Sequence, residues 1–206
     1  MTRISHGANA SDPHILLSMT QALPWLFAIF SGLSLALAMP GPGLGPLALL
    51  FPFLLLEALE RGRGKWRPWM LGLLAGTVFW TVSTNWVVPV MHHYGGLSRL
   101  AAMGCLVGMG AYLGLLWAIA ARVSSLVPTS WRIWLFPVVW VAATTLQRFP
   151  PYGFTWTGPA DAFVDWPWLM DSLSVWGASG LAWCVLAVSS AVWGLFQFGT
   201  RRSAAA

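Results

Sequence analysis

The residues best suited to chemistry in this sequence are few, and they lie at the edges of apolar runs. His92 and His93 are adjacent and are followed by Tyr94, Gly95 and Gly96. Neighbouring residues of a helix point in different directions, so two adjacent histidines make a poor pair of metal ligands. Two interpretations stay open: an interfacial polar edge that ends in a glycine turn, or a loop that contacts a lipid headgroup or another substrate.

Covalent catalysis would need an activated nucleophile with a base beside it. The two cysteines, Cys105 and Cys184, lie inside apolar stretches and share no metal-binding spacing, so we expect them to be buried, unreactive hydrophobic residues. The single lysine, Lys65, lies among arginines between two apolar runs. The sequence therefore predicts no catalytic residue, no metal site and no cofactor.

Other polar or aromatic residues each have two interpretations. Glu57 is followed by Glu60 and several arginines, and a solvated or snorkelling side chain explains it better than a function does. Asn85, beside Trp86, is expected to be buried and to hydrogen-bond to a neighbouring helix. Residues 152–156 (YGFTW) suit either a turn that contacts lipid or an interfacial anchor.

The composition indicates the kind of secondary structure that positions these residues. Of 206 residues, 57% are hydrophobic and 8% are charged, and the mean hydropathy is +0.68. Soluble domains carry about 25% charged residues because their surface faces water. The 15 tryptophans and 11 phenylalanines are typical of chains that cross a membrane interface. These properties predict an all-α integral membrane protein.

Six apolar runs follow a polar N-terminal tail, which we predict over residues 1–20. A helix needs roughly 20 apolar residues to cross the hydrocarbon core, so the runs predict about six transmembrane helices in a polytopic domain over 21–200. Residues 201–206 are then a second tail. The runs cover 22–39, 43–58, 68–91, 100–121, 131–146 and 173–199.

The basic residues are distributed unevenly over this six-span arrangement. Nine of the eleven fall on one side, and only Arg99 and Arg148 fall on the other. Positive charge marks the cytoplasmic side of membrane proteins, so both tails are predicted to be cytoplasmic. Nucleic acid is an unsuitable partner, because its binders cluster basic residues on one exposed face. The nine are Arg3, Arg61, Arg63, Lys65, Arg67, Arg122, Arg132, Arg201 and Arg202.

Residues 147–172 form an aromatic-rich segment on the opposite, periplasmic side. Four prolines exclude one continuous helix. Because irregular backbone is not tolerated against lipid, the segment is expected at the outer interface or folded back onto the helices. The sequence assigns no role to its three aspartates, Asp161, Asp165 and Asp171.

Four segments, 33–50, 85–98, 140–156 and 173–188, occur in a characteristic order, and the most specific motif is N-W-V-x6-Y-G-G from Asn85 to Gly96. Together they resemble the N-terminal membrane domain of apolipoprotein N-acyltransferase. The resemblance implies a multi-pass protein of the bacterial inner membrane that works with a periplasmic nitrilase-like domain. In that family an acyl chain moves from a membrane phospholipid to the amino-terminal cysteine of a diacylglyceryl apolipoprotein.

The resemblance also implies a substrate-binding set on the outer face. The family's aromatic residue before Gly-Gly corresponds to Tyr94. The tryptophan of its G-F-P-W motif corresponds to Trp156, with Gly153 and Phe154 matching and Thr155 replacing proline. We therefore expect substrate to contact Trp86, His93, Tyr94, Gly95, Gly153, Phe154 and Trp156.

The sequence departs from the family pattern in two places, and both bear on the activity that we expect. The family's E-x-L-R-like stretch reads Thr144 and Gln147 here, with Arg148 one place late. The Glu–Lys–Cys triad of the nitrilase-like domain has no counterpart, so we expect a membrane domain that is inactive alone or forms one part of a split enzyme with a separate nitrilase-like chain. The alternative is a non-catalytic lipid-binding scaffold or partner subunit. A small-solute transporter would show more polar residues within its spans.

Overall fold

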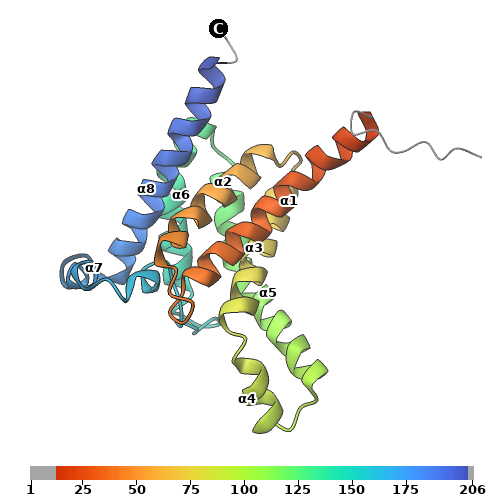
Figure 1. Cartoon of the computed structure of the whole chain (residues 1–206), viewed down its shortest axis with the longest axis vertical. Helices are drawn as coiled ribbons and strands as arrows, with labels where there is room; N and C mark the ends of the chain where they lie inside the picture. The colour runs from red at the N-terminus through yellow and green to blue at the C-terminus, as the bar shows by residue number, and fades with distance from the viewer. Residues whose placement is uncertain (1–12, 204–206) are drawn as a thin grey trace, which may run out of the picture.

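The structure, a computed structural model, describes residues 13–203 and the side chains of residues 21–199 (Figure 1). No strand occurs in this part of the chain, which agrees with the predicted all-α class. The elements are α1 (Pro13–Ala38), η1 (Gly45–Leu49), α2 (Leu50–Arg61), α3 (Arg67–Ser83), α4 (Val87–His93), α5 (Arg99–Ser124), α6 (Thr129–Leu146), η2 (Asp161–Phe163), α7 (Pro167–Asp171) and α8 (Leu173–Ser203).

Three helices are long and apolar enough to cross a membrane. They are α1 over Gln21–Ala38, α5 over Arg99–Ser124 and α8 over Leu173–Gly199. Helices α3 and α4 give a fourth candidate if they count as one span, although they are bent by 59° relative to each other. Helices α2, of 12 residues, and α6, of 18, are not among the candidates. The described chain thus provides three or four spans by length and composition.

The run 68–91, which we expected to be one helix, is broken at residues 84–86. Asn85 lies in this break and is exposed, so the expectation that it is buried between helices is wrong. Its Nδ2 donates a hydrogen bond to the Val82 carbonyl at 3.0 Å. An asparagine side chain that bonds to nearby backbone competes with the helical hydrogen bonds, and this favours a helix end.

Helices α3 and α5 share the most extensive interface in the molecule, and two glycine pairs face each other across it. Gly72 and Gly76 are one turn apart on α3, and Gly110 and Gly114 are one turn apart on α5. A Cβ at Gly76 would lie 2.7 Å from Cα of Gly114, so no side chain fits between the helices there. Such small-residue spacing lets two membrane helices approach closely.

Aromatic side chains fill the space between α2, α3, α5 and α6. Trp117 lies at their centre, with its ring centroid 4.4 Å from that of Trp140 and 5.1 Å from those of Phe51 and Phe79. All four residues are buried. Because aromatic rings bury a large apolar area, this cluster fixes the four helices against one another.

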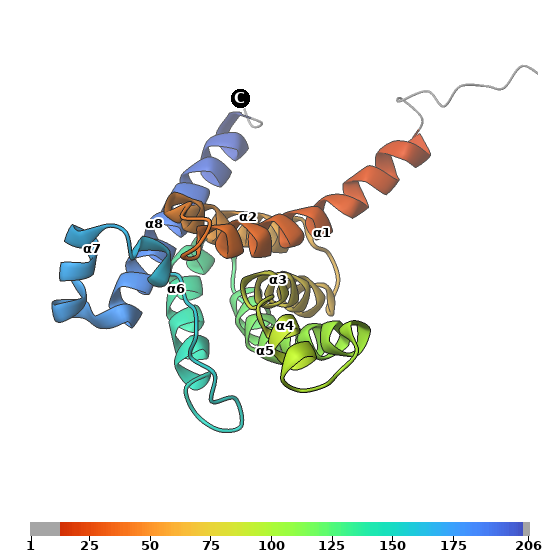
Figure 2. The same cartoon turned by 60° about the horizontal axis from the view of Figure 1, so that its bottom comes forward.

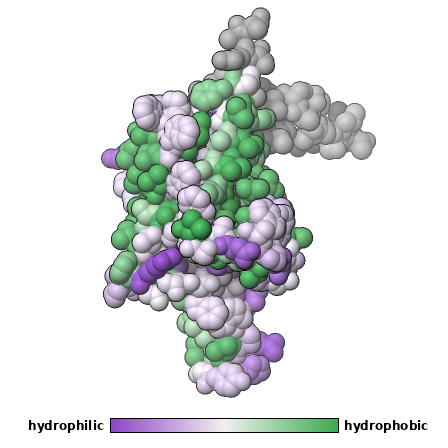
Figure 3. Space-filling model, turned by 90° about the vertical axis from the view of Figure 1, so that its left-hand side faces the viewer, coloured by the Kyte–Doolittle hydropathy of each residue, from purple (hydrophilic) through white to green (hydrophobic). Residues whose placement is uncertain are grey.

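The bundle has two ends, which carry different loops (Figures 1 and 2). One carries the loops at residues 61–67 and 122–132 and the end of α8, and we call it the basic end. There Arg132 Nη1 donates to Glu60 Oε2 at 2.9 Å, which joins the start of α6 to the end of α2. The other end carries residues 92–99 and 147–172, with Arg99 and Arg148. Hydrophilic residues gather below a largely apolar face in Figure 3.

Glu57 of α2 is buried, so the expectation of a solvated side chain is wrong. Only 3% of the residue is exposed. Its carboxylate accepts hydrogen bonds from Arg61 Nε at 2.6 Å, from Trp193 Nε1 at 3.0 Å and from Gln197 Nε2 at 2.5 Å. Because Trp193 and Gln197 belong to α8, this carboxylate joins α8 to α2 near the basic end.

The cysteines also differ from expectation. Cys105 on α5 and Cys184 on α8 are exposed on the outside of the bundle rather than buried in it. A helix that faces lipid needs no polar outer surface, so apolar residues occupy both of its faces. Helix α1, as described, covers Pro13–Ala38 and so includes residues 13–20 of the predicted tail. Helix α8 continues to Ser203, beyond the predicted boundary at 200, and residues 1–12 and 204–206 lie outside the description.

Candidate functional site

The segment between α6 and α8 is irregular, as predicted, and it folds back onto the bundle. It contains only the short helices η2 and α7. Tyr152 stacks on Tyr112 of α5 with ring centroids 4.9 Å apart, and Phe154 packs edge-on against Trp80 of α3 at 5.5 Å. Phe163 of η2 is buried in the main core. These contacts hold the segment on the bundle against α3 and α5.

A short loop at the start of this segment is closed by Gln147. Its Nε2 donates to the Phe154 carbonyl at 2.5 Å, and the Phe154 N–H donates to the Gln147 carbonyl at 3.2 Å. Gly153 has φ of +58°, a conformation that other residues rarely adopt. The buried Gln147, which stands where the resemblance implies an arginine, thus serves to fix the backbone before residue 155.

Residues 155–157 present their side chains in two directions. The ring of Trp156 lies 5.2 Å from that of Trp86, at the break between α3 and α4, and both rings are partly exposed. Thr155 and Thr157 instead line a cavity between α6 and α8. Successive residues of an extended chain point to opposite sides, which explains this separation. An exposed aromatic pair and a polar cavity therefore lie side by side.

The cavity has a volume of about 350 Å³, and we call it the polar pocket. The end of α6, the irregular segment and the start of α8 form its walls. Small residues such as Ala178 and Ala182 of α8 leave the space open. Its polar lining consists of Thr144, Gln147, Arg148, Thr155, Thr157, Asp161 and Ser179.

Hydrogen-bond donors gather in the polar pocket. Arg148 Nη2 donates to Ser179 Oγ at 3.3 Å, and the rest of the exposed guanidinium faces solvent or a ligand. Thr157 has a buried hydroxyl with no hydrogen-bond partner in the described part of the chain. Helix α8 is interrupted at Gly177, with φ of +63°, so a new helical segment begins beside the pocket and directs the positive end of its dipole there. The arrangement suits a carbonyl or phosphate oxygen.

Asp161 adds one acidic group to this pocket. Its carboxylate accepts a hydrogen bond from the Gly158 N–H at 2.7 Å. Partial burial raises the pKa of Asp161 above its usual value of 3.8, and this hydrogen bond opposes the rise. The folded state therefore slightly favours the protonated form of Asp161. As a result, the contribution of Asp161 to the free energy of unfolding falls as the pH rises from 3.8 through the pKa of the folded state. No ion pair joins Asp161 to Arg148 within the described residues, and Asp165 and Asp171 do not line the pocket.

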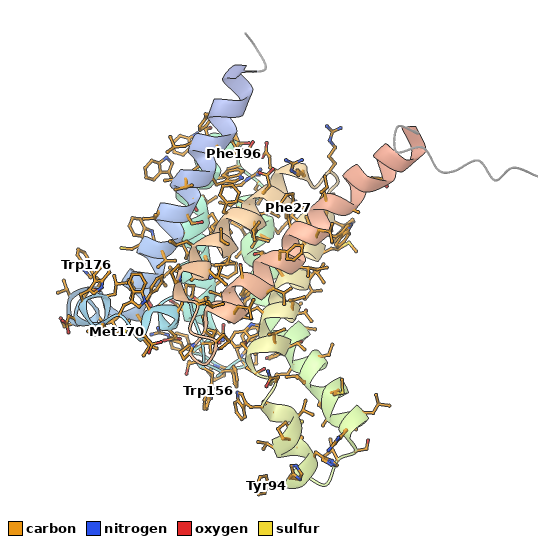
Figure 4. All side chains as sticks on the ribbon, viewed as in Figure 1. Phe27, Tyr94, Trp156, Met170, Trp176 and Phe196 are labelled. Carbon is orange, nitrogen blue, oxygen red and sulfur yellow. The ribbon has the colours of Figure 1, made fainter. Side chains whose placement is uncertain are left out.

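The structure divides the predicted substrate-binding residues into two groups. The first group lies around the ring contact between Trp86 and Trp156, and it consists of these two residues with Gly153 and Phe154. His93, Tyr94 and Gly95 lie at the tip of the hairpin formed by α4 and α5, away from Trp156 (Figure 4). Tyr94 is 89% exposed there.

Metal binding has no support in this geometry. The rings of His92 and His93 have centroids 5.1 Å apart. His92 Nδ1 lies 2.7 Å from the Leu97 carbonyl and helps to hold the hairpin turn. Nowhere in the described chain do three His, Cys, Asp or Glu residues form a group able to hold a metal ion.

Sequence reasoning missed the polar pocket, although one signal pointed to it. Among the described residues, Arg148 is one of two basic residues away from the basic end, and an isolated charge beside apolar runs is often functional. Asp161, Thr157 and Ser179 gave no comparable signal, because aspartate, threonine and serine are ordinary loop residues.

Comparison with known proteins gives a consistent family assignment. Residues 31–191 match the family model described as the N-terminal domain of apolipoprotein N-acyltransferase. The chain is 27% identical to the apolipoprotein N-acyltransferase of Pasteurella multocida over 189 residues, which cover 89% of the chain and 35% of that relative. It is 30% identical to the enzyme of the same name from Caulobacter vibrioides over 185 residues, covering 82% of the chain and 34% of the relative.

A third relative, from Geobacter metallireducens, is 31% identical over 141 residues. The match covers 64% of this chain and 26% of that relative, which is also described as apolipoprotein N-acyltransferase. The chain thus spans about a third or less of the length of these relatives. The resemblance seen in the four sequence segments is confirmed.

Proposed function

Because this chain belongs to the apolipoprotein N-acyltransferase family, as its N-terminal membrane domain, we propose that it is the membrane platform on which the lipid substrates of N-acyl transfer are held. The observation that carries the proposal is the polar pocket with the exposed Trp86–Trp156 pair beside it. A phospholipid has a polar headgroup with ester carbonyls and long apolar chains. The pocket offers donors to the first part, and the tryptophans offer apolar surface to the second.

The hairpin tip extends this substrate-binding surface in the proposal. Tyr94, with its chain neighbours His93 and Gly95, lies at the same end of the bundle as Trp156 (Figure 4). Tyrosine and histidine have an apolar body and a polar tip, which suits contact with headgroups at a membrane surface. The diacylglyceryl apolipoprotein, which also carries acyl chains, is the second substrate that we assign to this end.

We propose further that the chain is embedded in the bacterial inner membrane with six membrane-crossing segments over residues 21–200 and both tails in the cytoplasm. Helices α2 and α6 would be the shorter crossings, and α3 with α4 one bent crossing. Support comes from the basic end, where the loops after α2 and α5 lie together while residues 147–172 lie at the other end. The positive-inside rule then makes the basic end cytoplasmic and residues 147–172 periplasmic.

A labelling experiment tests this topology. In a chain with Cys105→Ala and Cys184→Ala, we expect a cysteine introduced by Ser98→Cys to react with a membrane-impermeant maleimide in intact spheroplasts. A cysteine introduced by Arg63→Cys should react only after the membrane is opened. Both residues are exposed in loops, so access to the reagent alone distinguishes them. Labelling of both before lysis, or the reverse pattern, would contradict the proposed topology.

The chain does not bring together the groups that acyl transfer through a Glu–Lys–Cys triad requires. Its only lysine, Lys65, is exposed at the basic end, whereas Cys105 and Cys184 lie on the outer faces of α5 and α8. We therefore propose that a nitrilase-like part, on the same or a separate polypeptide, supplies the catalytic groups. A non-catalytic scaffold is the less favoured alternative, because all three relatives described above are named as acyltransferases.

Lipid crosslinking tests the proposed site directly. We expect Trp156→Ala to reduce crosslinking of a photoactivatable phospholipid to the purified full chain in nanodiscs by roughly fivefold. Loss of part of one tryptophan surface from a lipid contact is worth about 1 kcal/mol, which corresponds to that change. Mass spectrometry should locate crosslinked peptides in residues 147–161 and at the tip of the hairpin.

The matched control is Trp134→Ala, because Trp134 on α6 is exposed to a similar extent, 70% against 62% for Trp156. We expect this control to leave crosslinking in residues 147–161 unchanged. Equal crosslinking in the wild type and the Trp156→Ala variant would remove Trp156 from the site. In a second arm, the chain reconstituted with a nitrilase-like domain should transfer an acyl group, and transfer unaffected by Trp156→Ala would contradict the assigned role.

A further inference from the structure

A second cavity lies at the basic end, remote from the polar pocket. It has a volume of about 670 Å³ and opens between the beginning of the span in α1 and the loop that joins α2 to α3. Gln21, Leu23 and Pro24 contribute one wall, and Arg61, Arg63 and Arg67 with Glu60 contribute the other. We call it the basic pocket. Neither the family assignment nor the proposed substrate site accounts for it.

The charges around the basic pocket do not cancel. Glu57 accepts a hydrogen bond from Arg61, and Glu60 pairs with Arg132. Three further cations, Arg63, Lys65 and Arg67, follow in the loop without additional acidic residues. Counted over these seven groups, five positive and two negative charges leave a net charge of +3. An excess of this size attracts an anion.

The backbone of the loop presents these cations outward. Gly64 has φ of +104°, which lets the chain turn between Arg63 and Lys65. At Gly62 a Cβ would lie 2.8 Å from Leu71 Cδ1, so the loop packs closely on α3. Arg63 is exposed and makes no hydrogen bond or ion pair to any described residue, so its guanidinium is available to a ligand. A planar guanidinium binds phosphate oxygens in a bidentate manner.

Aromatic residues at the rim indicate that the anion is part of a lipid. The guanidinium of Arg67 lies 5.1 Å from the ring centroid of Trp25, and the Lys65 ammonium lies 5.8 Å from that of Trp66. Trp66 is 67% exposed, and Leu26 and Phe30 leave an apolar strip exposed along α1. Tryptophan with lysine or arginine is typical of the headgroup level of a membrane, where acyl chains can follow such a strip.

We propose that the basic pocket binds the phosphate of an anionic phospholipid headgroup, with the acyl chains of that lipid lying along α1. The bound lipid would hold α1 against the loop between α2 and α3. This site is separate from the proposed substrate surface, because it lies at the opposite end of the bundle. The inference therefore holds or fails independently of the proposed function.

Native mass spectrometry of the full chain, released from nanodiscs of phosphatidylcholine with phosphatidylglycerol as the minor component, tests the proposal. We expect the wild type to retain phosphatidylglycerol in preference to phosphatidylcholine. The double variant Arg63→Gln with Arg67→Gln should reduce that retention roughly tenfold, because each basic residue near an anionic surface contributes a severalfold factor. Arg63→Gln alone, which removes no contact within the described chain, should reduce it severalfold and guards against misfolding of the double variant.

The matched control for Arg63→Gln is Arg99→Gln, which removes the same charge at the other end of the bundle. It should retain phosphatidylglycerol as the wild type does. An equal loss in this control, or equal retention of both lipids by the wild type, would overturn the proposal. Millimolar inorganic phosphate should not raise the midpoint of thermal unfolding as phosphatidylglycerol does, and an equal rise would show that a free phosphate, not a lipid, occupies the pocket.

Discussion

Replacing Glu57 by alanine is expected to lower the free energy of unfolding by about 2–4 kcal/mol, because it removes a buried acceptor that three side chains share. The carboxylate accepts hydrogen bonds from Arg61, Trp193 and Gln197. Its removal leaves the buried Nε1–H of Trp193 without this acceptor, at a cost of about 1–3 kcal/mol, and takes one hydrogen bond from Gln197. The change also removes the hydrogen bonds that Glu57 makes between α2 and α8.

Denaturation in mixed micelles, followed by circular dichroism, measures this effect. Glu57→Gln keeps an acceptor oxygen but loses the charge, so we expect a smaller decrease than for Glu57→Ala. Asp165→Ala is the matched control, because Asp165 is exposed outside the bundle core, and it should change the free energy of unfolding by less than about 0.5 kcal/mol. If Glu57→Ala lowers the free energy of unfolding no more than this control does, the carboxylate does not hold α8.

Adding a single methyl group at Gly76 should destabilise the chain by about 2–3 kcal/mol, the upper range for overpacking a close interface. In Gly76→Ala the new Cβ would meet Cα of Gly114 at 2.7 Å and Cγ of Trp117 at 2.9 Å. The first of these atoms is backbone, so relief requires α3 and α5 to separate. Separation would also disturb the aromatic cluster around Trp117.

Gly104→Ala is the control for this prediction, because a Cβ at Gly104 meets nothing within 4 Å although the residue lies on α5. Alanine is a better helix former than glycine, so this change should be neutral or stabilising by up to about 1 kcal/mol. Both variants are compared by thermal unfolding in the same detergent. Equal midpoints for the two variants would show that α3 and α5 tolerate a wider separation.

The candidate site could be foreseen only in part, and particular residues show why. The resemblance to the family indicated Phe154 and Trp156, because its G-F-P-W motif corresponds to residues 153–156. The same reasoning grouped them with Tyr94, which lies at the tip of the hairpin instead. The break at residues 84–86 decides that difference, since it leaves Trp86 beside Trp156 and carries α4 away. A hydropathy pattern contains no information on such a bend.

The sequence alone determined the membrane character, the helical class, the irregularity of residues 147–172 and the separation of basic residues from the aromatic-rich segment. Each follows from composition or from the order of residues within one segment, such as the prolines that exclude a helix. It did not determine the polar pocket, the burial of Glu57 or the fit of Gly76 against Gly114. Those depend on helices distant in sequence, as when Trp193 and Gln197 reach Glu57 across 136 and 140 residues. Only the packing of the helices brings such partners together, because a lipid-facing and a protein-facing apolar residue look the same in sequence.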